Sequence, residues 1–323
     1  MTPTPEISVI LPTYNRAKRI GQTIDSILGQ TYRNFELIIV DDGGTDETPH
    51  LVASYRDPRI QYFTIPHAGQ SAAKNFGLTK ANGSMIAFCD DDDVWMEGKL
   101  DEQTQFMKNH PNIDICYCGS FINEHGRDIH YYFLQISGDA LVTLLFVNPA
   151  TTPAYLIKRE CFTKVGYFDT SFTAVEDHLL WIKFAKYFKF GGIDKPLVRV
   201  YRGEKGVGRD YYQNIVNSNR SVLQELRAIL REMPERIPAR LEKKIIAYTK
   251  FKLAKAKLYA GRKLPAAATS LASLWLNPHN SEAWLLLPSC LLPSRIFASL
   301  IPRLQRRGGG RLPHLPKGVN INW

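Results

Sequence analysis

The stretch that decides the fold is Phe88-Cys89-Asp90-Asp91-Asp92-Asp93-Val94-Trp95. It continues an apolar run from Met85, so we expect a buried strand that ends at four consecutive carboxylates. No Lys or Arg follows until Lys99, and four neighbouring carboxylates cannot all stay ionised without a nearby positive charge. Because the ligands are all oxygens, the pattern favours a hard divalent cation, Mg²⁺ or Mn²⁺. The other interpretation is a solvated acidic turn that caps a helix beginning near Met96.

Short apolar runs alternate with amphipathic stretches on the N-terminal side of the aspartates. Strands are expected at residues 7–11, 35–40, 60–63 and 85–89, and helices at residues 20–28, 46–55 and 71–81. This alternation is typical of an α/β fold with a parallel sheet, in which ligands bind at the carboxyl ends of the strands. Polar clusters follow three of these strands, at residues 12–16, 41–46 and 90–93, and we expect them to face one crevice.

The sequence contains neither the GxGxxG motif of dinucleotide-binding folds nor the GxxxxGK[ST] motif of P-loops. A nucleotide could still be held by a carboxylate and an aromatic ring. Asp42 can accept hydrogen bonds from a base, and Tyr14 offers a ring for stacking. The simpler alternatives are a turn-forming Asp before Gly43-Gly44 and a partly buried Tyr.

A further acidic pair, Glu176-Asp177, opens an amphipathic helix in the second half of the chain. Before this helix we expect two strands joined by a turn at residues 123–126, and a further strand at residues 155–158. Acids in a first helical turn are stabilised by the helix dipole, which is the structural explanation for the pair. The functional alternative is a general base that takes a proton from an acceptor hydroxyl.

Positive charge is concentrated in the C-terminal part. Residues 201–323 hold 22 Lys or Arg and 7 Asp or Glu; removing these from the totals of 41 and 31 leaves 19 and 24 for residues 1–200. A basic region predicts affinity for an anionic surface, either phospholipid or nucleic acid. Residues 284–301 are leucine-rich but interrupted by Pro288, Pro293 and Arg295, so we expect them to lie on an anionic leaflet or to pack on the protein, and not to span a bilayer.

The cysteines and the N-terminus indicate the compartment. The five cysteines form no CxxC motif, which predicts reduced thiols, no zinc site and a cytoplasmic protein. Residues 1–6 have no apolar segment behind basic residues, so no signal peptide is expected.

The chain resembles the family 2 inverting glycosyltransferases, which share the GT-A fold. The residues that carry the resemblance are Ser8–Arg16, Glu36–Asp46, Gly69–Gly77, Phe88–Leu100 and Gly166–Trp181. It implies an α/β fold of the nucleotide-diphospho-sugar transferase type, with a Rossmann-like, mostly parallel sheet flanked by helices and a C-terminal helical extension. The expected boundaries are a GT-A domain at residues 1–209, a basic helical region at 210–307 and a disordered tail at 308–323.

The resemblance also implies the site. The donor would be bound by residues at or near the strand ends, namely Pro12, Thr13, Tyr14, Arg16, Asp42, Lys74, Asp90 and Asp91. Asp92 would meet the metal, Mn²⁺ or Mg²⁺, and Asp177 would be the base. Lys74 stands where arginine is common in the family, which keeps the positive charge but loses the two-pronged geometry for phosphate.

The implied reaction is a metal-dependent, inverting transfer of one sugar from a nucleotide-sugar donor, with a UDP-sugar favoured. The acceptor would be a hydroxyl of a glycan or lipid-linked molecule in cell-surface polysaccharide synthesis. The QxxRW motif of processive synthases is missing, which favours transfer of a single sugar. We expect a cytoplasmic protein, peripheral on the inner face of the cell membrane and without a nucleic-acid partner. The competing hypothesis is a noncatalytic membrane- or nucleic-acid-binding protein that uses the basic C-terminal region.

Overall fold

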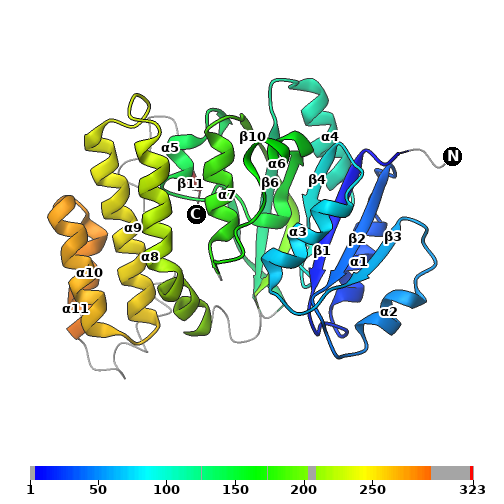
Figure 1. Ribbon diagram of the computed structural model, residues 1–323, viewed down its shortest axis with the longest axis horizontal. Coiled ribbons are helices and arrows are strands. Elements are labelled where there is room, and N and C mark those ends of the chain that lie inside the picture. The colour runs from blue at the N-terminus through cyan, green and yellow to red at the C-terminus, as the bar shows by residue number, and fades with distance from the viewer. Residues whose placement is uncertain (1–3, 125, 173, 203–208, 292–320, 323) are drawn as a thin grey trace. The chain divides into compact units, whose positions relative to one another are not determined.

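The chain divides into two compact units, and each is described here by itself. Unit 1 comprises residues 1–170, 176–204 and 316–323, and unit 2 comprises residues 171–175 and 205–315. The computed structural model describes residues 4–124, 126–172, 174–202, 209–291 and 321–322 (Figure 1). The expected disordered tail at 308–323 therefore lies outside the described residues, apart from Ile321 and Asn322.

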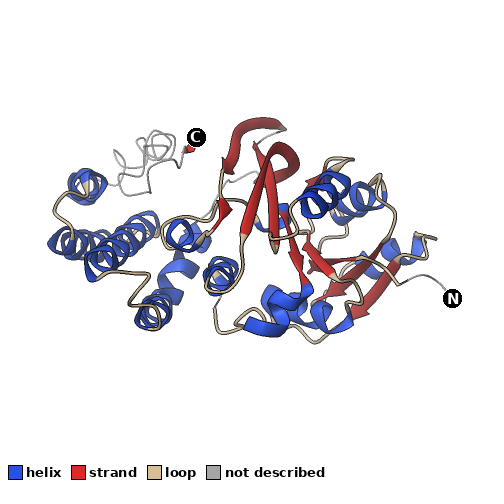
Figure 2. Cartoon of the chain, turned by 90° about the horizontal axis from the view of Figure 1, so that it is seen from above, coloured by secondary structure: helices blue, strands red, loops and turns tan. Residues whose placement is uncertain are grey.

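Unit 1 is built from a sheet with helices on both of its faces (Figure 2). Its strands are β1 (Ile7–Thr13), β2 (Phe35–Asp41), β3 (Ile60–Thr64), β4 (Met85–Phe88), β5 (Val94–Trp95), β6 (Ile115–Glu124), β7 (Arg127–Leu134), β8 (Ser137–Gly138), β9 (Tyr155–Lys158), β10 (Phe190–Arg202) and β11 (Ile321–Asn322). Its helical elements are α1 (Ile20–Leu28), α2 (Thr48–Ser54), α3 (Gln70–Lys80), α4 (Lys99–Asn109), α5 (Leu141–Leu144), η1 (Thr152–Ala154), α6 (Arg159–Val165) and α7 (Glu176–Ala185).

The strand order places the parallel strands where the sequence predicted them. β3, β2, β1 and β4 are neighbours and parallel, while β9 lies antiparallel between β4 and β6. β6 pairs with β7 as an antiparallel hairpin and with β10 in parallel. All residues of β1 and β2 are buried, which explains why these strands are continuous apolar runs.

The first strand is longer than the sequence suggested. Pro12 was expected to end it, but β1 continues to Thr13, with Pro12 opposite Val40 of β2. On the other side of β1, pairing with β4 stops at Ile10 opposite Phe88. Proline removes a donor from a ladder, and here it does so beyond the last β4 partner, where the lost donor is tolerated.

The acidic run does not cap a helix. Val94 and Trp95 form strand β5, which pairs with β10, and α4 begins only at Lys99. The N-cap position of α4 is Gly98, which makes no side-chain capping bond. The capping interpretation is therefore wrong, because a strand separates the acids from the helix.

Lys99 is a fully buried cation at the start of α4. Its Nζ lies 3.8 Å from the centroid of a Trp95 ring and donates to Gln103 Oε1 at 2.8 Å. Burial lowers the pKa of Lys99 to about 8, partly opposed by the nearby thiols of Cys118 and Cys89. The five cysteines of the chain are also buried and unpaired with one another, and burial raises the pKa of each thiol.

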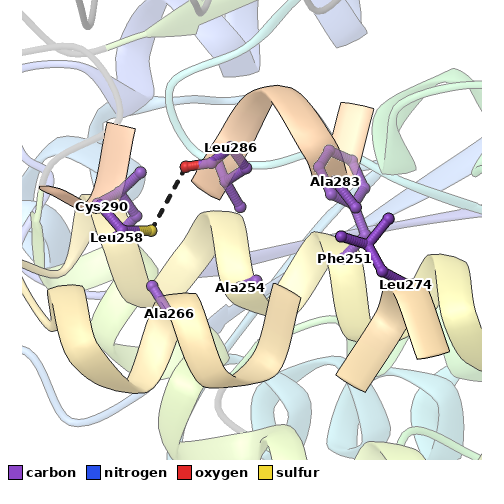
Figure 3. Close-up of a cluster of buried hydrophobic side chains, with 8 residues drawn as sticks. All are labelled: Phe251, Ala254, Leu258, Ala266, Leu274, Ala283, Leu286 and Cys290. Atoms are coloured by element: carbon purple, nitrogen blue, oxygen red, sulfur yellow. Dashed lines mark hydrogen bonds between the residues drawn. The ribbon is translucent and has the colours of Figure 1, made fainter. Parts of the chain in front are cut away.

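Unit 2 consists of the helices α8 (Arg209–Arg231), α9 (Ala239–Tyr259), α10 (Lys263–Leu276) and α11 (Ser281–Leu291). Gly261 turns the chain between α9 and α10 with φ of 83°, a conformation that favours glycine at a helix C-terminus. The helices α9, α10 and α11 share one apolar cluster of eight residues (Figure 3): Phe251, Ala254, Leu258, Ala266, Leu274, Ala283, Leu286 and Cys290. Within the described ranges, no helix has both the length and the apolar composition needed to cross a bilayer.

The buried Lys99 makes stability depend on pH. Because its folded pKa, about 8, lies below that of an unfolded lysine, the charged form destabilises the fold, and this cost disappears as pH rises from 8 towards 10.5. We expect Lys99→Met to remove the dependence. Between pH 7 and pH 10, the free energy of unfolding of the wild type should therefore rise by about 2 kcal/mol relative to that of the variant. Urea unfolding at both pH values measures this difference, and a constant difference would contradict the assignment.

Candidate functional site

The three polar clusters meet at the carboxyl edge of β1, β2 and β4. The Asp42 N–H donates to the Thr13 carbonyl at 2.9 Å, and the Thr45 N–H donates to Asn15 Oδ1 at 2.7 Å. On the β4 side, the Tyr14 N–H approaches Asp91 Oδ2 at 3.4 Å. The residues after β1 therefore contact both neighbouring clusters, as expected from the parallel order of the strands.

Asp42 is buried, at 3% exposure, and is held by the loop before α3. Its carboxylate accepts the N–H groups of Ala68 and Gly69, each at 2.8 Å, and His67 Nδ1 lies 2.8 Å from Oδ2. The His67 ring also stacks on Tyr14, with centroids 4.4 Å apart and an interplanar angle of 25°. Tyr14 nevertheless remains 43% exposed, so an open aromatic surface adjoins a fixed carboxylate.

The acidic run is contacted by cations and an amide. Arg16 Nε lies 3.5 Å from Asp91 Oδ1, and its Nη2 lies 3.8 Å from Asp92 Oδ2. From α3, Lys74 Nζ lies 3.6 Å from Asp90 Oδ1, to which Gln70 Nε2 donates at 2.7 Å. The first three acids thus have neighbours from two other parts of the chain.

The carboxyl groups remain short of positive charge despite these neighbours. Burial raises the pKa of Asp91 to about 6, and Arg16 opposes this effect. Burial and the charge of Asp90 likewise raise the pKa of Asp92, and that of Asp93 lies well above its ordinary value. Asp93 Oδ1 accepts the Tyr201 N–H at 3.1 Å, so this carboxyl also links the acidic run to strand β10. The solvated-turn interpretation is wrong, because desolvation dominates the chemistry of the run.

The oxygen donors of this run fit a hard divalent cation. A further positive charge near Asp92 would favour the ionised carboxylates, whose raised pKa values reflect crowding and burial. Among the residues that the structure describes, no three His, Cys, Asp or Glu side chains are arranged as a metal-binding group. A metal at Asp92 could take further oxygens from water and from a bound molecule, as Mg²⁺ commonly takes them from phosphates.

Lys74 connects the acidic run to the start of α7. Its side chain is 2% exposed and its Nζ lies 5.4 Å from the centroid of the Phe168 ring. Burial alone would lower the pKa of Lys74, but the charges of Asp90, Glu176 and Asp177 raise it above its ordinary value. The lysine is therefore a buried cation that contacts Asp90 and feels the charges of the two acids that open α7.

The close approach of α3 to the sheet depends on a glycine. A Cβ at Gly77 would lie 2.5 Å from Ile10 Cγ2 of β1, nearer than two carbon atoms can pack. Glycine therefore permits the contact that carries Lys74 and Gln70 to the strand ends.

Asp177 is oriented by two hydrogen bonds at the N-terminus of α7. Thr152 Oγ donates to Oδ2, and the His178 N–H donates to Oδ1, both at 2.7 Å. Just before the helix, Val175 has φ of 63°, a left-handed conformation that strains a β-branched residue. Burial raises the pKa of the neighbouring Glu176, helped by the charge of Asp177 and opposed by Lys74.

The structure brings most of the predicted residues together. Tyr14, Arg16, Lys74, Asp90, Asp91 and Asp92 are joined by the contacts above, and Asp177 is linked through Lys74. The Thr13 carbonyl accepts the Asp42 N–H, and Pro12 lies in β1 opposite Val40 of β2. Their roles towards a ligand stay predictions.

Three contacts were not foreseen: those of His67, Gln70 and Thr152. A signal existed for the first two, because both follow β3 and so lie beyond another carboxyl strand end. The sequence gives no such signal for Thr152, since a single threonine does not indicate a hydrogen bond to a carboxylate elsewhere in the chain.

We expect Lys74→Met to lower the free energy of unfolding at pH 7.5 by about 3 kcal/mol, because it leaves buried carboxylates without their shared cation. The pKa of Lys74 is raised, so its contribution is fully present at neutral pH and is lost only above that raised pKa. The loss should become smaller as the pH falls towards the raised pKa of Glu176, since protonation of that carboxyl relieves the repulsion.

The matched control is Lys80→Met, which removes an exposed lysine from the same helix. Lys80 Nζ lies 5.5 and 5.2 Å from the centroids of the Phe63 and Phe76 rings, so its removal should lower the free energy of unfolding, measured with urea, by no more than about 1 kcal/mol. Equal destabilisation by the two variants would contradict the shared-cation role of Lys74.

Comparison with known proteins agrees with this geometry. Residues 8–174 match the family model described as "Glycosyl transferase family 2". An uncharacterized glycosyltransferase of Rickettsia felis is 35% identical over 199 residues, which are 60% of this chain but 33% of that protein. The chain thus spans about a third of the length of the first relatives it matches. An Escherichia coli protein named UDP-Glc:alpha-D-GlcNAc-diphosphoundecaprenol beta-1,3-glucosyltransferase WfgD is 31% identical over 191 residues, 56% of this chain and 70% of that protein.

Solved structures show the same fold. Staphylococcus aureus TarS 1–349 in complex with UDP-GlcNAc superposes with a TM-score of 0.58 at 19% identity, covering 98% of this chain and 96% of that one. The mannosyltransferase PcManGT of Pyrobaculum calidifontis, in complex with GDP-Man and Mn²⁺, gives 0.52 at 20% identity, covering 94% and 89%. These likenesses confirm the expected GT-A type α/β fold with a C-terminal helical extension. Since the family model matches more than half of the chain, the protein belongs to glycosyl transferase family 2.

Proposed function

We propose that the protein is a metal-dependent inverting glycosyltransferase that moves one sugar from a nucleotide-sugar donor to a hydroxyl of a glycan or lipid-linked acceptor. The observation that carries the proposal is the buried Lys74, whose Nζ lies 3.6 Å from Asp90 of the acidic run and whose pKa is raised by the charges of Asp90, Glu176 and Asp177. It links a candidate diphosphate site to a candidate base in a chain of family 2. This arrangement favours a transferase over the noncatalytic binding protein considered from the sequence.

The donor nucleotide would lie at the β1 and β2 ends. Tyr14 offers an exposed ring for the base, and Asp42 offers carboxylate oxygens held in place by the Ala68 and Gly69 N–H groups. Pro12 and Thr13 would form the wall beside them, while Asp90 and Asp91 would meet the ribose and sugar. A UDP-sugar is favoured, and TarS was solved with UDP-GlcNAc, which supports this choice.

The diphosphate would lie at the acidic run. Lys74 and Arg16 would offset its negative charge, and Asp92 would hold Mn²⁺ or Mg²⁺ together with phosphate oxygens. A bound divalent ion neutralises charge on the departing nucleoside diphosphate. PcManGT was solved with GDP-Man and Mn²⁺, which supports the metal part of the proposal.

Asp177 would act as the base. Its two hydrogen bonds fix the carboxylate plane and leave lone pairs free to accept a proton from the acceptor hydroxyl. The hydroxyl oxygen then bonds to the anomeric carbon from the face opposite the diphosphate, whose bond to that carbon breaks. Attack from the opposite face inverts the configuration.

The name of one relative supports a proposal for the acceptor and for the cellular location. The name of WfgD gives a diphosphoundecaprenol-linked acceptor, which supports a lipid-linked acceptor and a role in cell-surface polysaccharide synthesis here. An enzyme with such an acceptor has to reach a membrane surface. We therefore propose a cytoplasmic protein, peripheral on the inner face of the membrane and without a nucleic-acid partner.

Asp177→Asn should lower the transfer rate by about 10² to 10⁴, because the amide cannot take the acceptor proton while it keeps most of the shape. Donor binding should persist. The measurement is release of nucleoside diphosphate in the presence of acceptor, beside a thermal shift with donor alone.

Glu160→Gln is the control, since Glu160 is an exposed carboxylate in the first turn of another helix, α6. It should transfer sugar at the wild-type rate. Wild-type turnover by Asp177→Asn would refute the assignment of the base.

A panel of UDP-, GDP- and dTDP-sugars with Mn²⁺ tests the donor. A donor present at 100 times its dissociation constant should stabilise the wild type by about 2.7 kcal/mol. Asp92→Ala should lose the Mn²⁺-dependent part of this gain, and Asp42→Ala should lose discrimination between bases. If no donor raises the melting temperature and Asp92→Ala behaves like the wild type, the proposed function fails.

A further inference from the structure

An apolar surface of unit 2 is open to solvent. Leu264, Leu271 and Trp275 of α10 are 79%, 54% and 84% exposed, and Trp284 and Leu285 of α11 are 54% and 73% exposed. We call these five residues the outer stripe. They make up more than half of the strongly exposed large hydrophobic residues in the described part of the chain, so they are a concentration and not scattered surface residues.

The outer stripe faces away from the core of its own unit. On α10, Leu264, Leu271 and Trp275 follow one helical face, while Ala266 and Leu274 point into the apolar cluster (Figure 3). On α11, Ala283, Leu286 and Cys290 take the inner positions. Ser270 of α10 donates to the Ala283 carbonyl at 2.8 Å, which joins the two helices directly. The inner faces of the two helices are therefore already packed, and the outer stripe takes no part in the apolar cluster of unit 2.

The helices of the apolar cluster contain many more basic than acidic residues. Residues 239–291, which form α9 to α11, contain nine Lys or Arg and two Asp or Glu. One of the two acids, Glu282, has its pKa raised by burial, and Lys255 opposes the shift. Helix α10 itself contains no acidic residue.

We infer that the outer stripe docks on an anionic phospholipid bilayer. Exposed tryptophan and leucine side chains can enter the headgroup region, while Lys and Arg of the same helices meet the lipid phosphates. A second copy of this chain would bring the same positive charge to the contact and be repelled. Nucleic acid binds mainly through contacts of Lys and Arg with its phosphates, to which the apolar side chains of the outer stripe would contribute no binding energy.

The inference rests on the proposed function for its purpose, because a lipid-linked acceptor gives membrane contact a use. Its physical basis is independent of that function, since it depends only on exposed apolar area and charge. The two can therefore be tested apart.

The experiment is co-sedimentation of the full chain with vesicles, without donor or metal. One set contains equimolar phosphatidylglycerol and phosphatidylcholine, and the other contains phosphatidylcholine alone. The test variant is the pair Leu271→Gln and Trp275→Gln, whose exposed side chains can change without disturbing the core. The control variant is the pair Ile129→Gln and Tyr187→Gln, an aliphatic and an aromatic residue of unit 1 that are 52% and 57% exposed.

The wild type and the control variant should bind the anionic vesicles, and the test variant should bind at least about tenfold more weakly, because two large apolar side chains no longer leave water. Binding should fall with added salt and be weak on phosphatidylcholine alone. Equal binding by both variants would overturn the inference, as would equal binding to the two kinds of vesicle.

Other occupants give other results. If the wild type binds no vesicle but elutes as a dimer that the test variant cannot form, the stripe is a contact between copies and the inference is overturned. If the wild type binds no vesicle and stays monomeric, the inference is likewise overturned. Both variants should show the wild-type thermal shift with donor, so failure of vesicle binding leaves the proposed function standing, and failure of donor binding leaves the vesicle result standing.

Discussion

The candidate site depends on one interaction, the sharing of the buried Lys74 ammonium among carboxylates from the β4 end and the start of α7. A lysine that is 2% exposed destabilises a fold unless opposite charge surrounds it. Here Asp90, Glu176 and Asp177 supply that charge, and the glycine contact between α3 and β1 brings the lysine to it. Charges from segments nearly ninety residues apart in sequence thereby act on one buried ammonium group.

The same crowding prepares the site for a charged ligand. Asp91, Asp92 and Asp93 have raised pKa values because burial and mutual repulsion outweigh Arg16. A fold optimised for stability alone would place apolar side chains there. The strain at Val175 has the same character, because a left-handed valine is tolerated only where the surrounding structure holds it. Both features support the proposal that this edge binds a ligand.

Much of this could be predicted from the sequence, for physical reasons that differ by element. Buried parallel strands are continuous apolar runs, so residues 7–11, 35–40 and 85–89 were recognisable, and the strand-end rule then placed Asp42 and Asp92 at one edge. The antiparallel β9 between β4 and β6 could not be derived, because its pairing is non-local. Thr152 was missed for the same reason. Of the outer stripe, Trp284 and Leu285 fell in the segment expected to lie on an anionic leaflet or to pack on the protein. The α10 residues were not recognised, since helical periodicity predicts an apolar face but does not say whether a neighbour covers it.

The buried thiols have a practical consequence. Because burial raises the pKa of every cysteine in the chain, little thiolate is present at neutral pH, and the thiolate is the form that alkylating reagents attack. Maleimide dyes should therefore not label the buried cysteines of the native protein. A single cysteine introduced on the surface would then carry a fluorophore alone, and the native cysteines would not need to be removed first.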